Sequence, residues 1–405
     1  SLISPFYKDF YSVTEVIYFC FLLIKHCIFS EDVLFLKKGC LNTLHDVVFQ
    51  QFNYNFSISV HMKLITPKKL SSGDKVATIS MSWGAAGDLP YRYQKGKERL
   101  NKIFNLEVTE TQHALQPAQW IYNNPEARAN DLMEAFSDPS VKAIISNIGG
   151  DDSIRMLPYI DLDIIRNNPK IFLGFSDSTI THFICLKAGL SSFYGTSLLV
   201  GFAENVSMHD YQISDIKRTL FSSSVIGLIQ PNQEGWTTEF LDWFDPSLQE
   251  VKRRLTPPTG WRFLRGTSIV QGPLIGGCME VLEMLKGTEY WPDPEIWKGC
   301  ILFFETSEGK PQPDFVRYWL RNYAATGILK NAKGIIFGRP YDNLYADEYE
   351  KEILKVLDEE GLYDLPVITR MDFGHTCPTF TLPYGKLAEI NCVDQSFSIL
   401  ENGVM

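Results

Sequence analysis

The sequence predicts an α/β fold in which a parallel sheet carries helices on both faces. Short apolar runs alternate with helical segments from Lys75 onward, which is the order expected of successive βα units. Hydrophobic residues make up 45% of the chain and charged residues 21%, so the chain can bury a core, and disorder, collagen and coiled coil are excluded as its main class. The length of 405 residues allows two or three domains.

The first half supplies the alternation of strands and helices. Apolar runs predict strands at 75–80, 142–147 and 170–175. Helices are expected near 95–105, at 130–136 with Asn130 as its cap, and at 178–188 with Gly189 at its end. Because each strand is followed by a helix, the sheet is predicted to be parallel.

The second half predicts a further unit that begins near Gly266. We expect helices at 276–286 and from Pro313, the latter with Phe315, Trp319 and Tyr323 on its apolar face. Strands are expected at 300–306, 334–337 and 367–371, and the alternation over 386–400 indicates a strand pair. The intervening stretch holds three tryptophans and a Pro-Pro pair and reads as a loop. The predicted domains are thus 62–230 and 266–405, joined by a linker and substrate loop over 231–265.

Residues 1–61 differ in composition from the rest. They contain no alanine, one glycine and one proline, yet nine of the 27 phenylalanines and three of the eight cysteines. Their apolar run at 16–24 has nine residues, whereas a spanning helix needs about 20. We therefore expect an extension that is not part of the main fold, with Met62 as a plausible native start. A membrane-associated or targeting role is the alternative.

Charge and cysteine spacing narrow the class of partner. The net charge of −10 repels phosphate backbones, so neither a nucleic-acid partner nor a membrane partner is expected. No cysteine pair has CxxC spacing, and no HExxH motif occurs, so neither a metal site nor a disulfide scaffold is expected. The dinucleotide and P-loop fingerprints are missing too, which argues against a nucleotide cofactor. Scattered cysteines fit a reducing, cytoplasmic setting.

The sharpest chemical motif is Gly174-Phe175-Ser176-Asp177-Ser178, at the point where an apolar strand must turn into a helix. A tight turn there can lift the Ser176 hydroxyl out of the sheet edge as a nucleophile. The alternative is that a serine or aspartate merely caps the helix.

A serine nucleophile needs a base, and histidine is the commonest one. Four histidines follow residue 61, at positions 113, 182, 209 and 375. His375 follows the strand at 367–371 and a Gly-containing turn, which places it best for reaching across a cleft, although a plain surface loop is the alternative. His182 is expected to pack on the helix behind Ser176.

The base needs an acceptor, and an attacked carbonyl needs hydrogen-bond donors. Glu305 ends the apolar run ILFFE and is expected to be partly buried, whereas its rivals Asp372 and Glu308 are expected to be more exposed. The backbone N–H of Asp177 and one from Gly149-Gly150 are the candidate oxyanion donors, with a tight turn or a phosphate loop as the alternative for the glycines.

Several of these segments, taken in order, resemble one known family. The stretch 124–179, the segment GPLIGGCMEVLEMLKGTEYWP, the strand end FFET and the turn DFGHT are similar to LD-carboxypeptidases, which are serine peptidases, and more closely to their microcin C immunity branch. The resemblance runs from about Met62 to the end. It implies a flavodoxin-like N-terminal domain, a smaller β-rich α/β C-terminal domain, often a homodimer, and no metal or cofactor.

The resemblance also assigns roles to residues. It implies a triad of Ser176, Glu305 and His375, with oxyanion donors from Asp177 and a glycine that we take as Gly150.

The implied substrate is a small peptide or an aminoacyl-nucleotide. The glycine motif continues here as Asp151-Asp152-Ser153, which favours the immunity branch, whose members cleave an aminoacyl-nucleotide bond. A base would then stack on Trp236 or Trp243, although both can simply pack the linker. The alternative is a murein tetrapeptide, cleaved by an LD-carboxypeptidase. A noncatalytic peptide or nucleotide binder is the alternative of another class.

Overall fold

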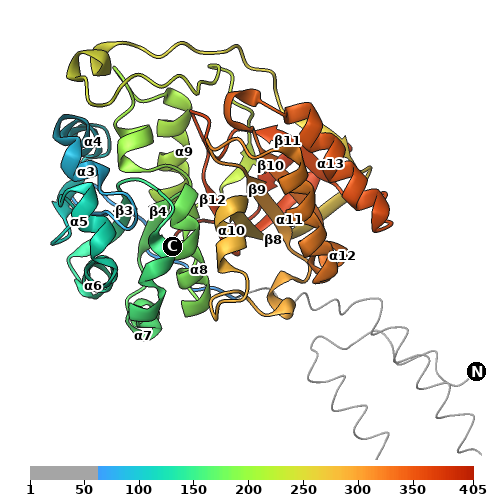
Figure 1. The fold of residues 1–405 in the computed structure, drawn as a ribbon, viewed down its shortest axis with the longest axis horizontal. Helices are drawn as coiled ribbons and strands as arrows, with labels where there is room; N and C mark the ends of the chain where they lie inside the picture. Colours follow the sequence, from blue (N-terminus) through green and yellow to red (C-terminus); the bar gives the residue numbers. More distant parts are fainter. Residues whose placement is uncertain (1–62) are drawn as a thin grey trace, which may run out of the picture. The chain divides into compact units, whose positions relative to one another are not determined.

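The computed structural model describes residues 63–405, so the predictions made for residues 1–61 lie outside the described residues. The chain divides into Ser1–Val60 and His61–Met405. All that follows concerns the second of these units, which is drawn in colour in Figure 1.

The first half forms the predicted α/β layer. Its sheet has six strands in the order β12-β5-β4-β3-β1-β2, parallel except for β12. The strands are β1 (Lys75–Ile79), β2 (Glu107–Glu110), β3 (Val141–Ser146), β4 (Ile171–Gly174), β5 (Phe193–Tyr194) and β12 (Leu382–Pro383). The main helices are α4 (Pro90–Phe104), α6 (Pro125–Ser137), α7 (Leu162–Asn167), α8 (Thr179–Ala188) and α9 (Asp210–Leu220), with α3 (Ala85–Asp88) and α5 (Ala118–Asn123) as short turns. The parallel sheet and the α/β class are therefore confirmed.

Helices cover both faces of this sheet, as the sequence predicts. The apolar sides of α4 and α9 pack on one face through residues such as Leu100 and Ile216. Those of α6 and α8 pack on the other through Phe136 and Ile184. Burial of both faces explains why the central strands read as continuous apolar runs.

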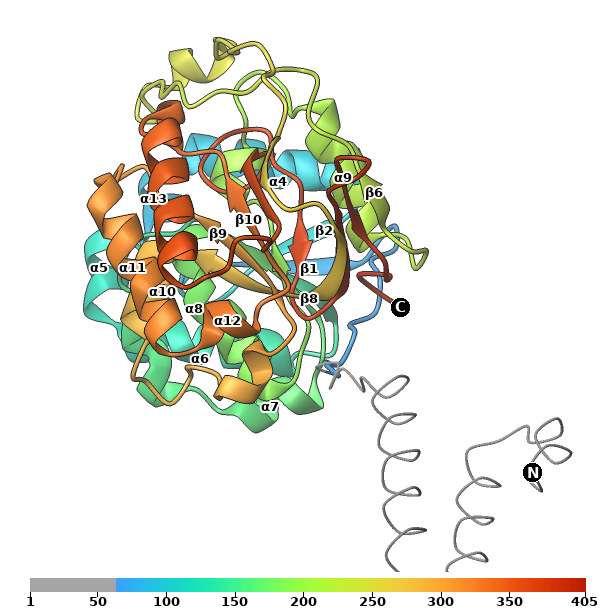
Figure 2. The same cartoon turned by 90° about the vertical axis from the view of Figure 1, so that its right-hand side faces the viewer.

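The second half forms an eight-stranded mixed sheet in the order β6-β14-β13-β8-β9-β10-β11-β7. The strands are β6 (Gly227–Ile229), β7 (Arg262–Arg265), β8 (Ile269–Cys278), β9 (Ile301–Glu305), β10 (Gly334–Gly338), β11 (Val367–Met371), β13 (Leu387–Asn391) and β14 (Ser396–Ile399). The helices are α10 (Met279–Leu285), α11 (Pro313–Ala325), α12 (Ile328–Asn331) and α13 (Ala346–Glu359). In Figure 2, α11 and α13 stand beside β9 and β10 on the left, and α12 lies below them.

Two edge strands cross between the halves. β6 lies within the predicted N-terminal domain but pairs with β14, and β12 lies within the predicted C-terminal domain but pairs with β5. One apolar core runs through both halves, since it contains Phe172 of β4 and Phe303 of β9. The two sheets are thus tied together both by strand pairing and by packing.

Several local predictions were wrong, and each has a physical reason. The helix expected at 130–136 begins earlier, at Pro125, because proline suits the first helical position. Gly276 continues β8, and the helix there begins only at Met279. On α11 the buried side chains are those of Val316, Leu320 and Tyr323, whereas Phe315 is half exposed. The aromatic spacing of four was therefore right for Tyr323 and for the partly buried Trp319, and wrong for Phe315.

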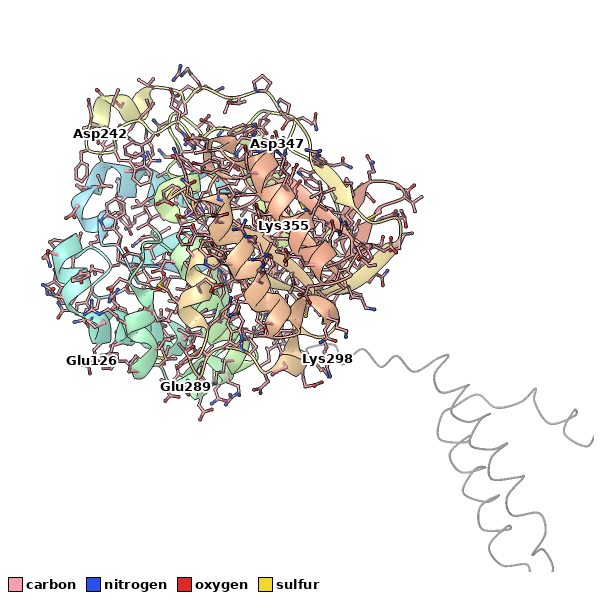
Figure 3. The ribbon with its side chains drawn as sticks, turned by 45° about the vertical axis from the view of Figure 1, so that its right-hand side comes forward. Glu126, Asp242, Glu289, Lys298, Asp347 and Lys355 are labelled. Carbon is pink, nitrogen blue, oxygen red and sulfur yellow. The ribbon has the colours of Figure 1, made fainter. Side chains whose placement is uncertain are left out.

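Residues 231–261 connect the two halves and contact both of them; we call this segment the strap. It runs along the top of the two sheets in both ribbon views, and Asp242 marks it at the upper edge in Figure 3. Gln249 accepts a hydrogen bond from Arg92 of α4, and the Thr238 carbonyl accepts one from Tyr341 on the other half. The strap is mostly irregular, as predicted, but 262–265, expected to belong to it, are β7. Within residues 63–405, no helix is long and apolar enough to cross a membrane.

Candidate active site

Ser176 lies at the carboxyl end of β4, in the turn that leads into α8. Its backbone φ is +61°, in the left-handed region that non-glycine residues rarely adopt. Such a conformation costs on the order of 1–3 kcal/mol and persists only where the surroundings impose it. The turn therefore has the strained geometry of a nucleophile elbow rather than that of a simple helix cap.

His375 reaches Ser176 from the other half of the molecule. It follows β11, and its Nε2 lies 3.0 Å from Ser176 Oγ although 199 positions separate the two residues. The Phe175 ring packs edge-on against the imidazole, with the ring centroids 5.1 Å apart. The structure thus brings the candidate nucleophile and its candidate base together, one from each half of the molecule.

Glu305 approaches the opposite nitrogen of the same imidazole. It is the last residue of β9 and is fully buried, and its Oε2 lies 2.6 Å from His375 Nδ1. Tyr194, at the end of β5, donates its hydroxyl to Glu305 Oε1 and accepts the Ser176 N–H at 3.1 Å. Both carboxylate oxygens are therefore satisfied, which makes burial of this charge tolerable.

The surroundings of His375 stabilise its protonated form. Burial opposes protonation, but the charge and hydrogen bond of Glu305, with the charges of Glu308 and Glu280, outweigh it and raise the pKa of His375 to about 9. His375 Nδ1 is turned toward Glu305, so Nε2 is the nitrogen that faces Ser176 Oγ.

The other three histidines of residues 63–405 have structural partners of their own. His182 lies between Ser192 Oγ and the Gly174 carbonyl, and burial lowers its pKa to about 3, so it is neutral. His113 pairs with Asp131, and His209 lies between Glu204 and Glu234, of which the second belongs to the strap. None of them is hydrogen-bonded to Ser176.

The rivals of Glu305 differ from expectation in one respect. Asp372 was expected to be exposed, but it is buried, because it accepts hydrogen bonds from the Trp261 indole and the Asn232 backbone and pairs with Arg339. It fastens the strap to β11. Glu308 is exposed, as expected, yet its Oε2 lies 3.1 Å from His375 Nε2.

The glycine loop after β3 lies against the nucleophile. A Cβ on Gly149 would come within 2.9 Å of Ser176 Oγ, and Gly150, with φ of +142°, packs against Ser82 and the Trp83 backbone. Asp177 holds this loop, because its Oδ2 accepts the N–H groups of Asp152 and Ser153. Of the two predicted glycines, Gly149 thus lies against Ser176 and the Asp177 nitrogen, whereas Gly150 lies against Ser82 and Trp83.

Comparison with protein families assigns the chain. Residues 76–195 match the LD-carboxypeptidase N-terminal domain, and residues 271–390 match the LD-carboxypeptidase C-terminal domain. The chain belongs to the LD-carboxypeptidase family. It is accordingly a peptidase-type hydrolase.

Individual members of the family point to two kinds of substrate. The microcin C7 self-immunity protein MccF of Escherichia coli is 28% identical over 85% of this chain and 97% of its own length. The probable murein peptide carboxypeptidase of Bacillus subtilis is 26% identical over 84% of this chain and 95% of its own length. The MccF-like protein from Streptococcus pneumoniae, solved with AMP, is 31% identical over 81% of this chain and 98% of that chain, with a TM-score of 0.74. MccF itself has been solved with aspartyl sulfamoyl adenosine, and that structure matches at 26% identity over 84% of this chain and 100% of that one, with a TM-score of 0.74.

The two candidate stacking tryptophans lie on the strap, at different places. Trp236 is 6% exposed, and the Arg339 guanidinium lies 5.0 Å over its ring; the next residue, Thr237, pairs with Cys377 of the His375 loop. Trp243 is partly buried on the side of the first sheet, with Arg92 4.1 Å over its ring. Trp236 is therefore the one tied to the loop that carries His375.

Sequence reasoning did not predict the contacts that two further groups make with the candidate catalytic residues. Tyr194 ends β5, in the segment SFYGT, at the same edge of the sheet as Ser176. This position at a strand end is the sequence feature from which its contact with Ser176 could have been predicted. Glu308 was weighed only as a rival of Glu305 for the acceptor that orients the base, whereas it lies beside His375 Nε2, the nitrogen that faces Ser176. Within the part of the chain that the structure describes, no cluster of three or more potential metal ligands occurs.

Proposed function

We propose that this chain is a serine hydrolase in which Ser176 attacks the scissile carbonyl, His375 moves the proton and Glu305 orients His375. The proposal is carried by one observation: Ser176 Oγ, both ring nitrogens of His375 and the Glu305 carboxylate form a continuous hydrogen-bonded line. These residues are 70 and 199 positions apart in the sequence, so only the fold brings them together. The strained Ser176 backbone supports the same role.

The chemistry follows from that line. Neutral His375 accepts the Ser176 hydroxyl proton at Nε2 while Oγ bonds to the carbonyl carbon, and the imidazolium then protonates the departing amine. Water repeats the sequence on the acyl-enzyme and frees Ser176. For the oxyanion we propose the backbone N–H groups of Asp177 and Gly150 as donors; the neighbouring Gly149 lies directly against Ser176 Oγ and the Asp177 nitrogen.

For the substrate we favour the amide bond of an aminoacyl-nucleotide. Relatives that match over nearly their whole length have been solved with AMP and with aspartyl sulfamoyl adenosine, which supports this class. Trp236 and Trp243 are the aromatic groups that we propose for the base, and an arginine guanidinium lies over the ring of each. Cleavage of a murein tetrapeptide is the second candidate, and the murein peptide carboxypeptidase relative supports it.

Two substrates tested side by side decide between these functions. Purified full-length protein is incubated with aspartyl sulfamoyl adenosine and with a murein tetrapeptide, and product formation is followed by chromatography, with Ser176→Ala as the control. We expect turnover of the first substrate, loss of it in the variant, and labelling of Ser176 by a fluorophosphonate. Labelling of the Ser176→Ala variant at the wild-type rate would contradict the nucleophile, and binding without turnover would favour the noncatalytic reading.

Two further expectations concern the setting of the enzyme. A homodimer and a cytoplasmic location follow from the resemblance and the cysteine usage, and both stay predictions. Sedimentation of the purified chain tests the first.

A further inference from the structure

The solvent side of His375 carries a charged group that the hydrolytic mechanism does not use. Glu308 lies in the turn after β9, its side chain is 65% exposed, and its Oε2 lies 3.1 Å from His375 Nε2. Ser176 Oγ lies 3.0 Å from the same nitrogen. Two groups with opposite effects thus lie beside His375 Nε2. The Ser176 hydroxyl must give this nitrogen a proton, whereas the Glu308 carboxylate stabilises the form in which the nitrogen already carries one.

The turn that carries Glu308 is held firmly in place. Glu280, in the first turn of α10, accepts the Ser307 N–H at 2.9 Å, and the Lys310 N–H closes the turn onto the Ser307 carbonyl. Lys310 itself pairs with Asp342 at 2.5 Å. Within residues 63–405, His375 is the only cationic partner that Glu308 has in an ion pair.

The exposed face of Glu308 coincides with the route of the substrate. The reacting carbonyl must come within about 3–3.5 Å of Ser176 Oγ. His375 is nearly buried and Glu305 fully so, which leaves the side occupied by Glu308 open to solvent. A positive group near the scissile carbonyl would therefore meet this carboxylate before it met any other acidic group bonded to His375.

We propose that Glu308 is a specificity residue that binds a free ammonium group of the substrate and, in doing so, releases His375 Nε2 to accept the proton of Ser176. The proposal rests on the serine-hydrolase function above and names the substrate feature that its site selects. In an aminoacyl compound the α-ammonium is two bonds from the carbonyl carbon, within reach of Glu308. Without such a cation, Glu308 stays on His375 and holds the base in its protonated, inactive form.

The charges around His375 set the direction of the pH effect. Glu305 on β9, Glu308 on the following turn and Glu280 on α10 all favour the imidazolium, against the effect of burial, and together they raise the pKa of His375 to about 9. A base that must be neutral is thus mostly protonated at pH 7, and it gains activity as the pH rises toward 9. Removing the Glu308 charge lowers that pKa, so the base becomes active at lower pH.

Two measurements on four proteins test this inference. Wild type, Glu308→Gln, Glu308→Asp and the exposed Glu360→Gln control, which removes the same charge without an ion-pair partner, are labelled with a neutral fluorophosphonate across pH 6–10. Whichever substrate is turned over is then supplied with its amino group free or acetylated. The labelling reads only the activation of Ser176, and the substrate pair reads recognition of the ammonium.

We expect the two readouts to move in opposite directions. In Glu308→Gln the midpoint of labelling should fall by about one pH unit, giving up to about tenfold faster labelling at pH 7. Its preference in kcat/KM for the free amine should drop by about tenfold or more, and Glu308→Asp should lie between it and wild type. A merely structural role would slow both reactions.

Two results separate failure of this inference from failure of the hydrolase itself. An unchanged labelling midpoint, or an unchanged amine preference, in Glu308→Gln would overturn the role of Glu308 while leaving the triad intact. Equal labelling of wild type and Ser176→Ala would instead remove the proposed function on which it rests.

Discussion

The proposed nucleophile and its proposed base come from two regions of the molecule that are assembled differently. Ser176 is presented by a single local unit, the strand β4, a turn and helix α8, which are consecutive in the chain. Glu305 and His375 come from β9 and from the loop after β11, two strands that β10 separates in the second sheet and that lie 70 positions apart at the contact. The nucleophile thus depends on local geometry, whereas the base depends on how the strands of the second sheet are ordered.

The largest effect is expected from changing the residue that orients the base. In Glu305→Gln the amide oxygen still accepts the Tyr194 hydroxyl, so the NH₂ group turns toward His375 Nδ1. The imidazole then carries its proton on Nε2 and cannot accept one from Ser176, which should lower kcat by about 10⁴-fold. Steady-state kinetics measures this loss.

A control and a double variant sharpen this test. Glu360→Gln removes one surface charge and should leave kcat unchanged. Combining Glu305→Gln with Ser176→Ala should lower kcat little below Ser176→Ala alone, because the triad acts as a unit. If the kcat losses of the two single variants added up in the double variant, Ser176 and Glu305 would act independently of each other.

A smaller effect is expected at the strap, which touches both regions. If Trp236 stacks on a nucleobase, Trp236→Ala should weaken kcat/KM for aspartyl sulfamoyl adenosine by about 1–3 kcal/mol, or roughly 5- to 150-fold, mainly through KM. A small peptide substrate should change far less. Trp243→Ala is the paired variant, because its ring has a similar guanidinium neighbour on the other half. Equal losses on both substrates would indicate structural damage, and no loss in either variant would remove the aromatic platform.

Tyr194 is the contact that links the two regions, and its loss should have a moderate effect. Tyr194→Phe leaves one oxygen of the buried Glu305 and the Ser176 N–H without this partner, which should cost about 1–3 kcal/mol of stability. Because the same oxygen fixes the carboxylate beside His375, we expect kcat to fall roughly tenfold as well. Tyr384→Phe is the matched control, since that buried hydroxyl bonds the Gly276 carbonyl instead. If both variants lose activity equally, Tyr194 serves stability alone.

The same contrast explains what could be predicted from the sequence. The strands at 75–80, 142–147, 170–175 and 367–371 were found because they are buried runs bounded by polar or turn residues, a local signal. Ser176 was found in the same way, from the turn after β4. His375 and Glu305 needed chemical elimination and family resemblance, since no spacing rule relates them.

What was missed depends on non-local packing. The burial of Asp372 arises from Trp261 and Asn232, which approach from the strap. The exchange of β6 and β12 between the sheets could not be predicted, because strands of two or three residues carry almost no pattern. The second role of Glu308 required knowing on which side of the imidazole it lies.

The smallest effect is expected from deleting residues 1–61, which were predicted to be an extension of the main fold. Every motif discussed above lies after Met62, and residues 1–61 differ from the rest in composition. The first described residues are held by contacts within the rest of the fold. The Lys69 N–H donates to the carbonyl of Met405, and Ile65 pairs with Leu190. Deleting residues 1–61 should therefore leave kcat/KM and the melting temperature nearly unchanged, as measured by substrate turnover and calorimetry.

A deletion that extends to residue 70 should lower the melting temperature, because it also removes these contacts and the buried Leu70. A truncated protein lacking only 1–61 that is insoluble or inactive would show that the segment is part of the working enzyme.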